Sequence, residues 1–111
     1  HDIVIRGNYI HDILFSENSG DPHIDGIQSN SFSGSHALNV LVEKNHIYLW
    51  QEAKSGVISS CSMMLGGADN WTIRNNIFES WGGMNTSNTG TNSNMKFYNN
   101  TFRSNIDWVN R

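Results

Sequence analysis

The chain has 111 residues, a net charge of −3 and only 15% charged residues, with ten glycines and one proline. This length is at most one domain, and the mild charge without a basic patch argues against nucleic acid as a partner. No run of about 20 apolar residues predicts a membrane-spanning helix. Abundant Gly, Asn and Ser are typical of a turn-rich, all-β protein.

A short phrase occurs four times along the chain. It reads IVIRGNYI at 3–10, VLVEKNHI at 40–47, WTIRNNIF at 71–78 and MKFYNNTF at 95–102. Each copy has an apolar–x–apolar pair, a polar stretch ending in Asn, and an apolar residue two places later. Repeats of roughly 20–50 residues indicate a repeat fold. Because the alternation inside each phrase has a period of two, we predict a β-solenoid of about four coils.

The phrases predict strands whose side chains alternate between core and solvent. The first and third residues of each phrase should point inward and stack in columns: Ile3 and Ile5, Val40 and Val42, Trp71 and Ile73, Met95 and Phe97. The second residues, Val4, Leu41, Thr72 and Lys96, should point outward. The fourth residues should do so too. Strands lie about 4.8 Å apart, so Arg6, Glu43 and Arg74 are expected to form a ladder of alternating charge.

The asparagines Asn8, Asn45, Asn76 and Asn100 are expected at a corner of the solenoid. Asn tolerates left-handed backbone geometry and its amide can bond backbone at a turn. Stacked Asn side chains can also bond each other as an amide ladder. Trp50 and Trp81 each follow a ladder Asn by five residues, so they should occupy equivalent places in neighbouring coils. They either pack on the solenoid wall or form a platform for sugar rings.

The segment GDPHIDGIQS at 20–29 holds the residues best suited to chemistry. Asp21, His23 and Asp25 alternate, so on an extended strand they share one face, about 6.6–6.8 Å apart. They could bind calcium, act as a general acid and base, or flank a glycosidic bond. Gly26 would let a ligand or backbone approach, and Gln28 would bond either a sugar hydroxyl or a buried amide. The alternative is a turn followed by a tight corner, with His23 solvated.

The repeat phrases resemble those of right-handed parallel β-helix proteins of the pectate-lyase-like superfamily. HIDG at 23–26 is similar to the His-x-Asp-Gly stretch of many carbohydrate-active β-helix proteins, and CSMMLGGADN at 61–70 resembles a pectate lyase segment. The resemblance implies a right-handed parallel β-helix, with 1–111 as one segment of a larger domain. It also implies a secreted or cell-surface protein that acts on polysaccharide. In that family a sheet face binds uronic acid polymers, with calcium held by acidic side chains and an Arg or Lys taking the proton.

Two functions remain open. The first is a polysaccharide lyase or glycoside hydrolase segment that acts on an acidic polysaccharide. It assigns catalysis to His23 and Asp25, substrate contacts to Gln28, Asp21, Trp50 and Trp81, and possible calcium ligands to Asp21 and Asp25. The second is a non-catalytic glycan-binding, adhesin-like or filament-forming solenoid. Low charge favours it, as does Cys61-Ser62 standing where the lyase segment carries a lysine.

Three smaller expectations complete the sequence-based picture. Cys61 is expected to be a small apolar residue without a base to activate it, and Glu79 is expected to be solvated. Neither end of the sequence shows a capping element of the kind that solenoids require. Uncapped ends expose strand edges, so we expect end-to-end self-association.

Overall fold

The computed structural model describes residues 1–13, 24–31, 33–49, 60–80, 82–86 and 90–103. Every regular element in these ranges is a β-strand, and they contain no helix long and apolar enough to cross a membrane. The strands are β1 (Ile3–Arg6), β2 (Tyr9–Ile10), β3 (Ile24–Ser29), β4 (Ala37–Leu38), β5 (Val40–Glu43), β6 (His46–Tyr48), β7 (Ser60–Leu65), β8 (Ala68–Asp69), β9 (Thr72–Arg74), β10 (Ile77–Glu79), β11 (Met84–Asn85), β12 (Lys96–Tyr98) and β13 (Thr101–Arg103).

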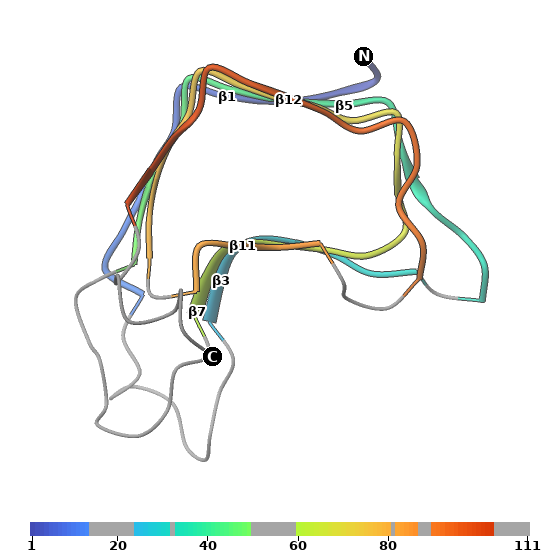
Figure 1. The fold of residues 1–111 in the computed structure, drawn as a ribbon, viewed down its shortest axis with the longest axis horizontal. Coiled ribbons are helices and arrows are strands. Elements are labelled where there is room, and N and C mark those ends of the chain that lie inside the picture. Colours follow the sequence, from blue (N-terminus) through green and yellow to red (C-terminus); the bar gives the residue numbers. More distant parts are fainter. Residues whose placement is uncertain (14–23, 32, 50–59, 81, 87–89, 104–111) are drawn as a thin grey trace.

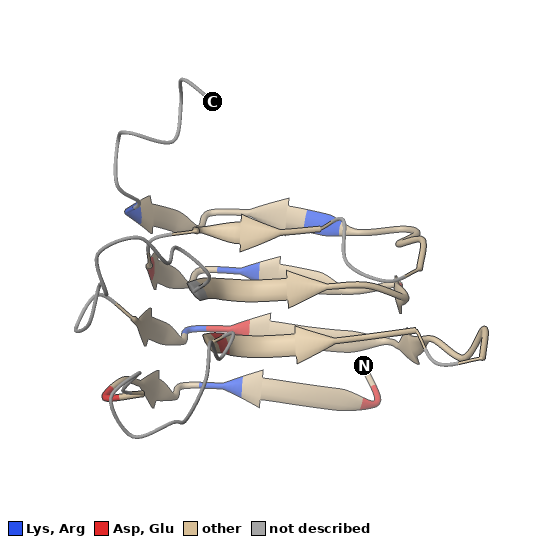
Figure 2. Ribbon diagram, turned by 90° about the horizontal axis from the view of Figure 1, so that it is seen from below, with Lys and Arg blue, Asp and Glu red and all other residues tan. Residues whose placement is uncertain are grey.

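Strands at equivalent places in successive repeats pair with each other. The sheets run β1-β5-β9-β12, β2-β6-β10-β13, β3-β7-β11 and β4-β8, and the pairings among the described strands are parallel. We call β1–β4 rung 1, β5–β8 rung 2, β9–β11 rung 3, and β12 with β13 rung 4. The rungs superpose when viewed along the stack (Figure 1) and separate into layers when viewed across it (Figure 2). This all-β, stacked arrangement is consistent with a β-solenoid.

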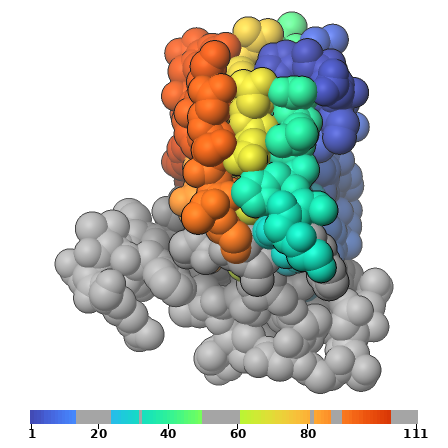
Figure 3. Space-filling model, turned by 90° about the vertical axis from the view of Figure 1, so that its right-hand side faces the viewer, coloured from blue at the N-terminus to red at the C-terminus, as the bar shows by residue number. Residues whose placement is uncertain are grey.

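The strand register is the one that the repeated phrase predicts. Ile5 aligns with Val42, Val42 with Ile73, and Ile73 with Phe97. Val42 and Ile73 are fully buried in the core between the sheets. Phe97 is exposed, and among the described strands its strand, β12, has a neighbouring strand on one side only. Figure 3 shows the rungs as adjacent bands in chain order.

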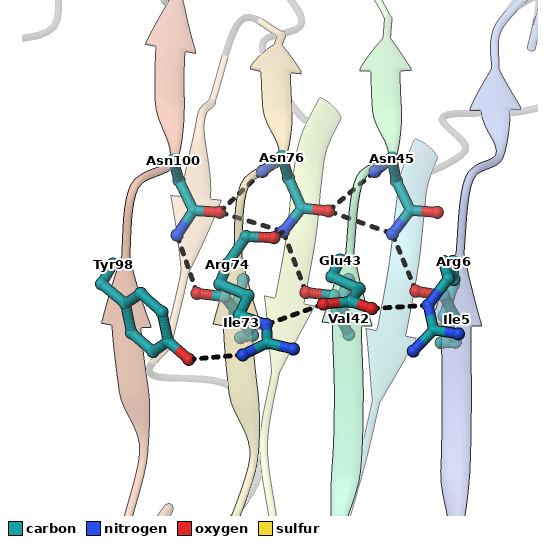
Figure 4. A network of polar contacts seen from close by, with 10 residues as sticks. All are labelled: Ile5, Arg6, Val42, Glu43, Asn45, Ile73, Arg74, Asn76, Tyr98 and Asn100. Atoms are coloured by element: carbon teal, nitrogen blue, oxygen red, sulfur yellow. Dashed lines mark hydrogen bonds and ion pairs between the residues drawn. The ribbon is translucent and has the colours of Figure 1, made fainter.

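The predicted charge ladder is present on the outside of the first sheet. Arg6 Nε donates to Glu43 Oε1, and Arg74 Nε donates to Glu43 Oε2 at 2.7 Å. Arg74 also donates to the Tyr98 hydroxyl, so the row continues through rung 4 (Figure 4). Leu41, also predicted to point outward, lies outside the core cluster but is buried. Outward orientation on this sheet therefore does not mean solvent exposure.

The asparagine ladder is confirmed, and its bonds follow a fixed direction (Figure 4). Asn45 Oδ1 accepts from both the backbone N and Nδ2 of Asn8, at 3.0 and 2.9 Å. Asn76 and Asn100 accept in the same way from the preceding Asn. The left-handed backbone lies one residue earlier than expected, with positive φ at Gly7, Lys44, Asn75 and Asn99. The ladder Asn serves as the hydrogen-bonding residue, and its predecessor makes the turn.

A second ladder, which the sequence analysis did not identify, precedes the first strand of each rung. Asn39 Nδ2 donates to Asp2 Oδ2, Asn70 Nδ2 to Asn39 Oδ1, and Asn94 Nδ2 to Asn70 Oδ1. The three asparagines have positive φ. Here each rung donates to the rung before it, whereas in the first ladder each rung donates to the rung after it. The two ladders fix both ends of the first-sheet strands.

The rungs differ in length, but not on the side that carries the two ladders. Equivalent residues of the first sheet are 37, 31 and 24 positions apart. In every rung the first column residue and the apolar residue after the ladder Asn are seven positions apart, as for Val40 and Ile47. The difference in rung length therefore lies in the connections to and from the third sheet, β3-β7-β11. The candidate site residue Asp25 is in this sheet, in β3.

Candidate functional site

Asp25 lies on the outer face of the third sheet. Its neighbours in β3 face the interior, since Ile24 is part of the core and Gly26 faces Ile47. The alternation of a strand therefore directs Asp25 outward. Asp25 aligns with Cys61, whose backbone N donates to Asp25 Oδ1 at 3.2 Å. This bond fixes a half-buried carboxylate against the next rung.

Gly26 is required by the packing of the protein against itself. A Cβ placed there would lie 2.5 Å from Ile47 Cγ2 and 2.7 Å from the Ser62 carbonyl oxygen. These separations are too short for any side chain. Of the two interpretations of this glycine, close approach by the protein's own chain is confirmed, because interior atoms fill the space that a Cβ would occupy.

Gln28 is exposed beside Met64, with which it is in register. Its Nε2 lies 3.9 Å from Met64 Sδ, and thioether sulfur is only a weak acceptor. The alternative of a buried amide in a ladder is therefore wrong for Gln28. Asn85 aligns with Met64 on the other side, so Gln28, Met64 and Asn85 form one row across the third sheet.

The other predicted site residues, Asp21, His23, Trp50 and Trp81, lie outside the described residues. The structure consequently places Asp25 and Gln28 on one sheet and leaves the proposed His23 partnership as a prediction. Within the described ranges, no group of three or more His, Cys, Asp or Glu residues could hold a metal ion. Asp25 alone does not supply the six to eight oxygen ligands that calcium takes.

Cys61 has the environment of an inert thiol. Burial raises the pKa of Cys61 to about 11, and the nearby Asp25 carboxylate adds to this shift. The nucleophilic form of cysteine is the thiolate, which such a pKa suppresses at neutral pH. Cys61 is therefore a protonated, unreactive thiol beside Asp25, in agreement with the expectation from the sequence.

A polar cluster on the second sheet, β2-β6-β10-β13, corrects the prediction for Glu79. This carboxylate is buried; His46 Nε2 lies 2.6 Å from its Oε2, and Arg103 donates to its Oε1 at 2.8 Å. The bond with His46, and then that with Arg103, lowers the pKa of Glu79 against the opposing effect of burial. Tyr9 stacks on His46 with ring centroids 4.8 Å apart. Sequence reasoning missed the cluster because its members come from four rungs.

A second cluster joins three rungs near β4 and β8. His36 Nδ1 lies 2.6 Å from Asp69 Oδ2, and the Ser93 hydroxyl donates to Asp69 Oδ1 at 2.7 Å. The bond from Ser93, and then that from His36, lowers the pKa of Asp69. The carboxylate lies between hydroxyl and imidazole, whereas activation of a serine nucleophile needs the imidazole next to the hydroxyl. The arrangement therefore joins rungs and does not form a catalytic triad.

No protein-family model, curated protein or solved structure matches the chain.

Proposed function

We propose that the chain is a right-handed parallel β-helix that binds and cleaves a polysaccharide along the outer face of β3, β7 and β11. Right-handed crossover is the general rule for parallel strands joined within one sheet, and the parallel rungs support its use here. A stack of rungs offers an extended side face, which suits a polymer. The reaction is lyase or hydrolase chemistry on a secreted or cell-surface protein, as the resemblance implies.

The observation that carries the proposal is the position of Asp25. Its carboxylate is directed outward from a sheet and is held in place by the Cys61 backbone N–H. A carboxylate fixed on a rigid strand can act as an acid or base on a substrate lying across the rungs. In this proposal His23, two residues earlier in the sequence, exchanges protons with the substrate alongside Asp25. The exposed Gln28, three residues further along β3, contacts a sugar hydroxyl.

Charge bears on the substrate class. The described strands of this face, β3, β7 and β11, carry Asp25 and neither Lys nor Arg. These strands therefore supply no cation of their own for uronate groups, so any cation that an acidic polysaccharide meets would come from other segments. The proposed substrate class is the acidic polysaccharide that the resemblance implies, and no step is derived through calcium.

A non-catalytic glycan-binding or filament-forming solenoid is the second candidate. Asp25 accepts a hydrogen bond from the protein's own backbone, and atoms of the protein fill the space next to the Gly26 Cα. Both contacts are compatible with a purely structural role for this strand. These contacts hold β3 against β7 whether or not a substrate binds.

A panel assay separates the two candidates. Neutral and uronic acid polymers are incubated with the protein, with and without calcium, while ultraviolet absorbance of unsaturated uronates and release of reducing ends are followed. Asp25→Asn keeps an oxygen that accepts from Cys61 N–H, so we expect it to fold and to lose about 10²–10⁴-fold in kcat. Asp12→Asn, an exposed Asp on the second-sheet side of rung 1, is the matched control.

Each outcome decides between the proposals. Absorbance gain identifies a lyase, and reducing ends without absorbance identify a hydrolase. Glycan binding without product, in a folded sample, supports the non-catalytic solenoid. Product formation that is unchanged in Asp25→Asn overturns the assignment of Asp25, and the absence of both binding and product overturns the carbohydrate proposal.

A further inference from the structure

The apolar columns of the core reach the surface at both ends of the stack of described rungs. Val42 and Ile73 are 0% exposed, whereas Phe97, which continues their column in rung 4, is 40% exposed. Phe102 is 46% exposed at the same end, and Ile3 is 50% exposed at the rung 1 end. β1 and β2 are edge strands at one end, and β12 and β13 at the other. Each end thus presents strand edges beside exposed core side chains.

The first asparagine ladder gives these ends a direction. In each step, the backbone N–H and Nδ2 of one Asn donate to Oδ1 of the Asn in the following rung. Asn100 is the last described member, and its Nδ2 donates to the Ile73 carbonyl at 2.9 Å. The same rule assigns the remaining donors of Asn100 to an Asn Oδ1 in a rung stacked beyond it. Asn8 of rung 1 carries such an oxygen at the equivalent position.

Charge is complementary between the two ends. The ionisable residues of β12 and β13 include Lys96 and Arg103, and the Arg103 side chain is 75% exposed. Rung 1 carries Asp2 and Asp12, with the Asp12 side chain 59% exposed, while its Arg6 is paired with Glu43 of rung 2. Two rung 4 ends facing each other would bring like charges together. A rung 4 end facing a rung 1 end places Arg103 in register with His11, whose Nδ1 is bonded to Asp12 Oδ2, so Arg103 approaches the Asp12 carboxylate beside it.

We propose that the rung 4 end of one copy of this chain stacks head to tail on the rung 1 end of a second copy. β12 then pairs in parallel with β1 of the second copy, and β13 with β2. The register that runs through the chain places Asn100 on Asn8, Tyr98 on Arg6 and Phe97 on Ile5. Arg74 already donates to the Tyr98 hydroxyl at 3.1 Å, so Arg6 would repeat an existing contact. This inference is independent of any activity toward glycans.

One contact in this interface is mismatched. In the second ladder each rung donates through Nδ2 to the rung before it, as Asn94 does to Asn70 Oδ1 at 2.8 Å. The second copy would present Asp2 to Asn94 Oδ1, and an ionised carboxylate has no hydrogen to donate. Asp2→Asn supplies the missing donor and still accepts from Asn39. This single substitution should therefore strengthen association rather than weaken it.

Sedimentation velocity over a range of protein concentrations tests the proposal. Head-to-tail stacking along the axis of the rungs gives an open assembly, so we expect wild-type species that grow beyond a dimer. Asp2→Asn should raise the association constant about fivefold to tenfold, the effect of about one hydrogen bond. Asp69→Asn, the same change in an inner rung, is the control and should not strengthen association.

Charge reversal provides a second, independent arm. Arg103→Glu should weaken association, and adding Asp12→Arg should restore it, with circular dichroism confirming that each variant is folded. A folded wild type that stays monomeric at all concentrations overturns the proposal. A dimer that does not grow, or association that Asp2→Asn leaves unchanged, overturns the head-to-tail geometry.

Discussion

The inner rungs and the end rungs share the same strand phrase but place equivalent side chains in different surroundings. Ile73 in rung 3 is fully buried, whereas Ile5 in rung 1, from the same column, is only partly buried. Asn76 is likewise buried, whereas Asn8 is exposed. Each rung contacts mainly its neighbours, so stability is approximately a sum of nearest-neighbour terms. The number of neighbouring rungs, rather than residue type, therefore sets how much a side chain contributes to the free energy of unfolding.

Loss of a ladder amide should have the largest effect in an inner rung. Asn76→Ala removes the partners of the Val42 and Arg74 carbonyls and of two donors on Asn45. Each buried group left without a partner costs about 1–3 kcal/mol, so we expect at least about 3 kcal/mol of lost unfolding free energy. Asn8→Ala should cost about 1 kcal/mol, because it removes one side-chain bond. Equal losses in urea denaturation would contradict the comparison.

Truncation of a core isoleucine should also cost more stability in an inner rung than in an end rung, and here the two substitutions are identical. Ile73→Ala deletes a fully buried side chain and should cost about 2–5 kcal/mol. Ile5→Ala is the same substitution in the same column of an end rung and should cost less than half as much. Both values are measured by chemical denaturation, monitored by circular dichroism, at protein concentrations at which the chain is monomeric. A larger loss for Ile5→Ala would mean that the rung 1 end is covered in solution.

The charge ladder predicts that stability depends on pH through Glu43, and that Arg74 affects the pKa of Glu43 more than Arg6 does. The bond from Arg74, followed by contacts with Arg6, lowers the pKa of Glu43 below its usual 4.5 despite the opposing effect of burial. The folded pKa lies below the unfolded one, so the stabilisation is present above pH 4.5 and is lost as pH falls through the folded pKa. We expect Arg74→Gln to raise the pKa of Glu43 more than Arg6→Gln does. NMR titration of the Glu43 carboxyl carbon measures both, and the opposite order would refute the prediction.

The smallest effect should be a gain at the left-handed turn of rung 2. Lys44 has a φ of 55°, at the position where the other rungs have Gly7, Asn75 and Asn99. Asn adopts this conformation more readily than Lys, so Lys44→Asn should stabilise the protein by about 0.5–1 kcal/mol. Lys44→Ala provides the control, because it removes the same charge without this preference. A gain as large for Ala would trace the effect to charge.

The sequence predicted the first sheet well because its phrases have equal length and a clear period. A slip of one residue would turn Val42 and Ile73 outward, so only one register keeps the columns and also joins Arg6, Glu43 and Arg74. The left-handed position was misplaced by one residue because asparagine fills both adjacent roles in Asn75-Asn76 and Asn99-Asn100. The sequence signal of the second ladder is the Asp or Asn that stands directly before each phrase.

The candidate site was less predictable because β3 does not keep a strict alternation. Ile24 and Ile27 both pack on the core although they are three residues apart, so periodicity alone cannot assign both halves of the strand. Asp25 lies on an outward strand face, whereas the expectation that Asp21 and His23 share this face falls outside the described residues. Gly26 meets Ile47 from the next rung. Contacts between residues so far apart in the sequence require knowledge of the stacking.

The constant length of the ladder side has a consequence for how such a chain lengthens. Trp71 and Met95 occupy equivalent places, so residues 71–94 form one complete repeat of 24 residues. A tandem duplication of this segment would join Asn94 to a new Trp71, which reproduces the existing Asn70–Trp71 junction. The insertion would add one layer of about 4.8 Å while extending both ladders. Duplication of this segment can thus lengthen the solenoid without requiring any strand or turn sequence that the chain does not already contain.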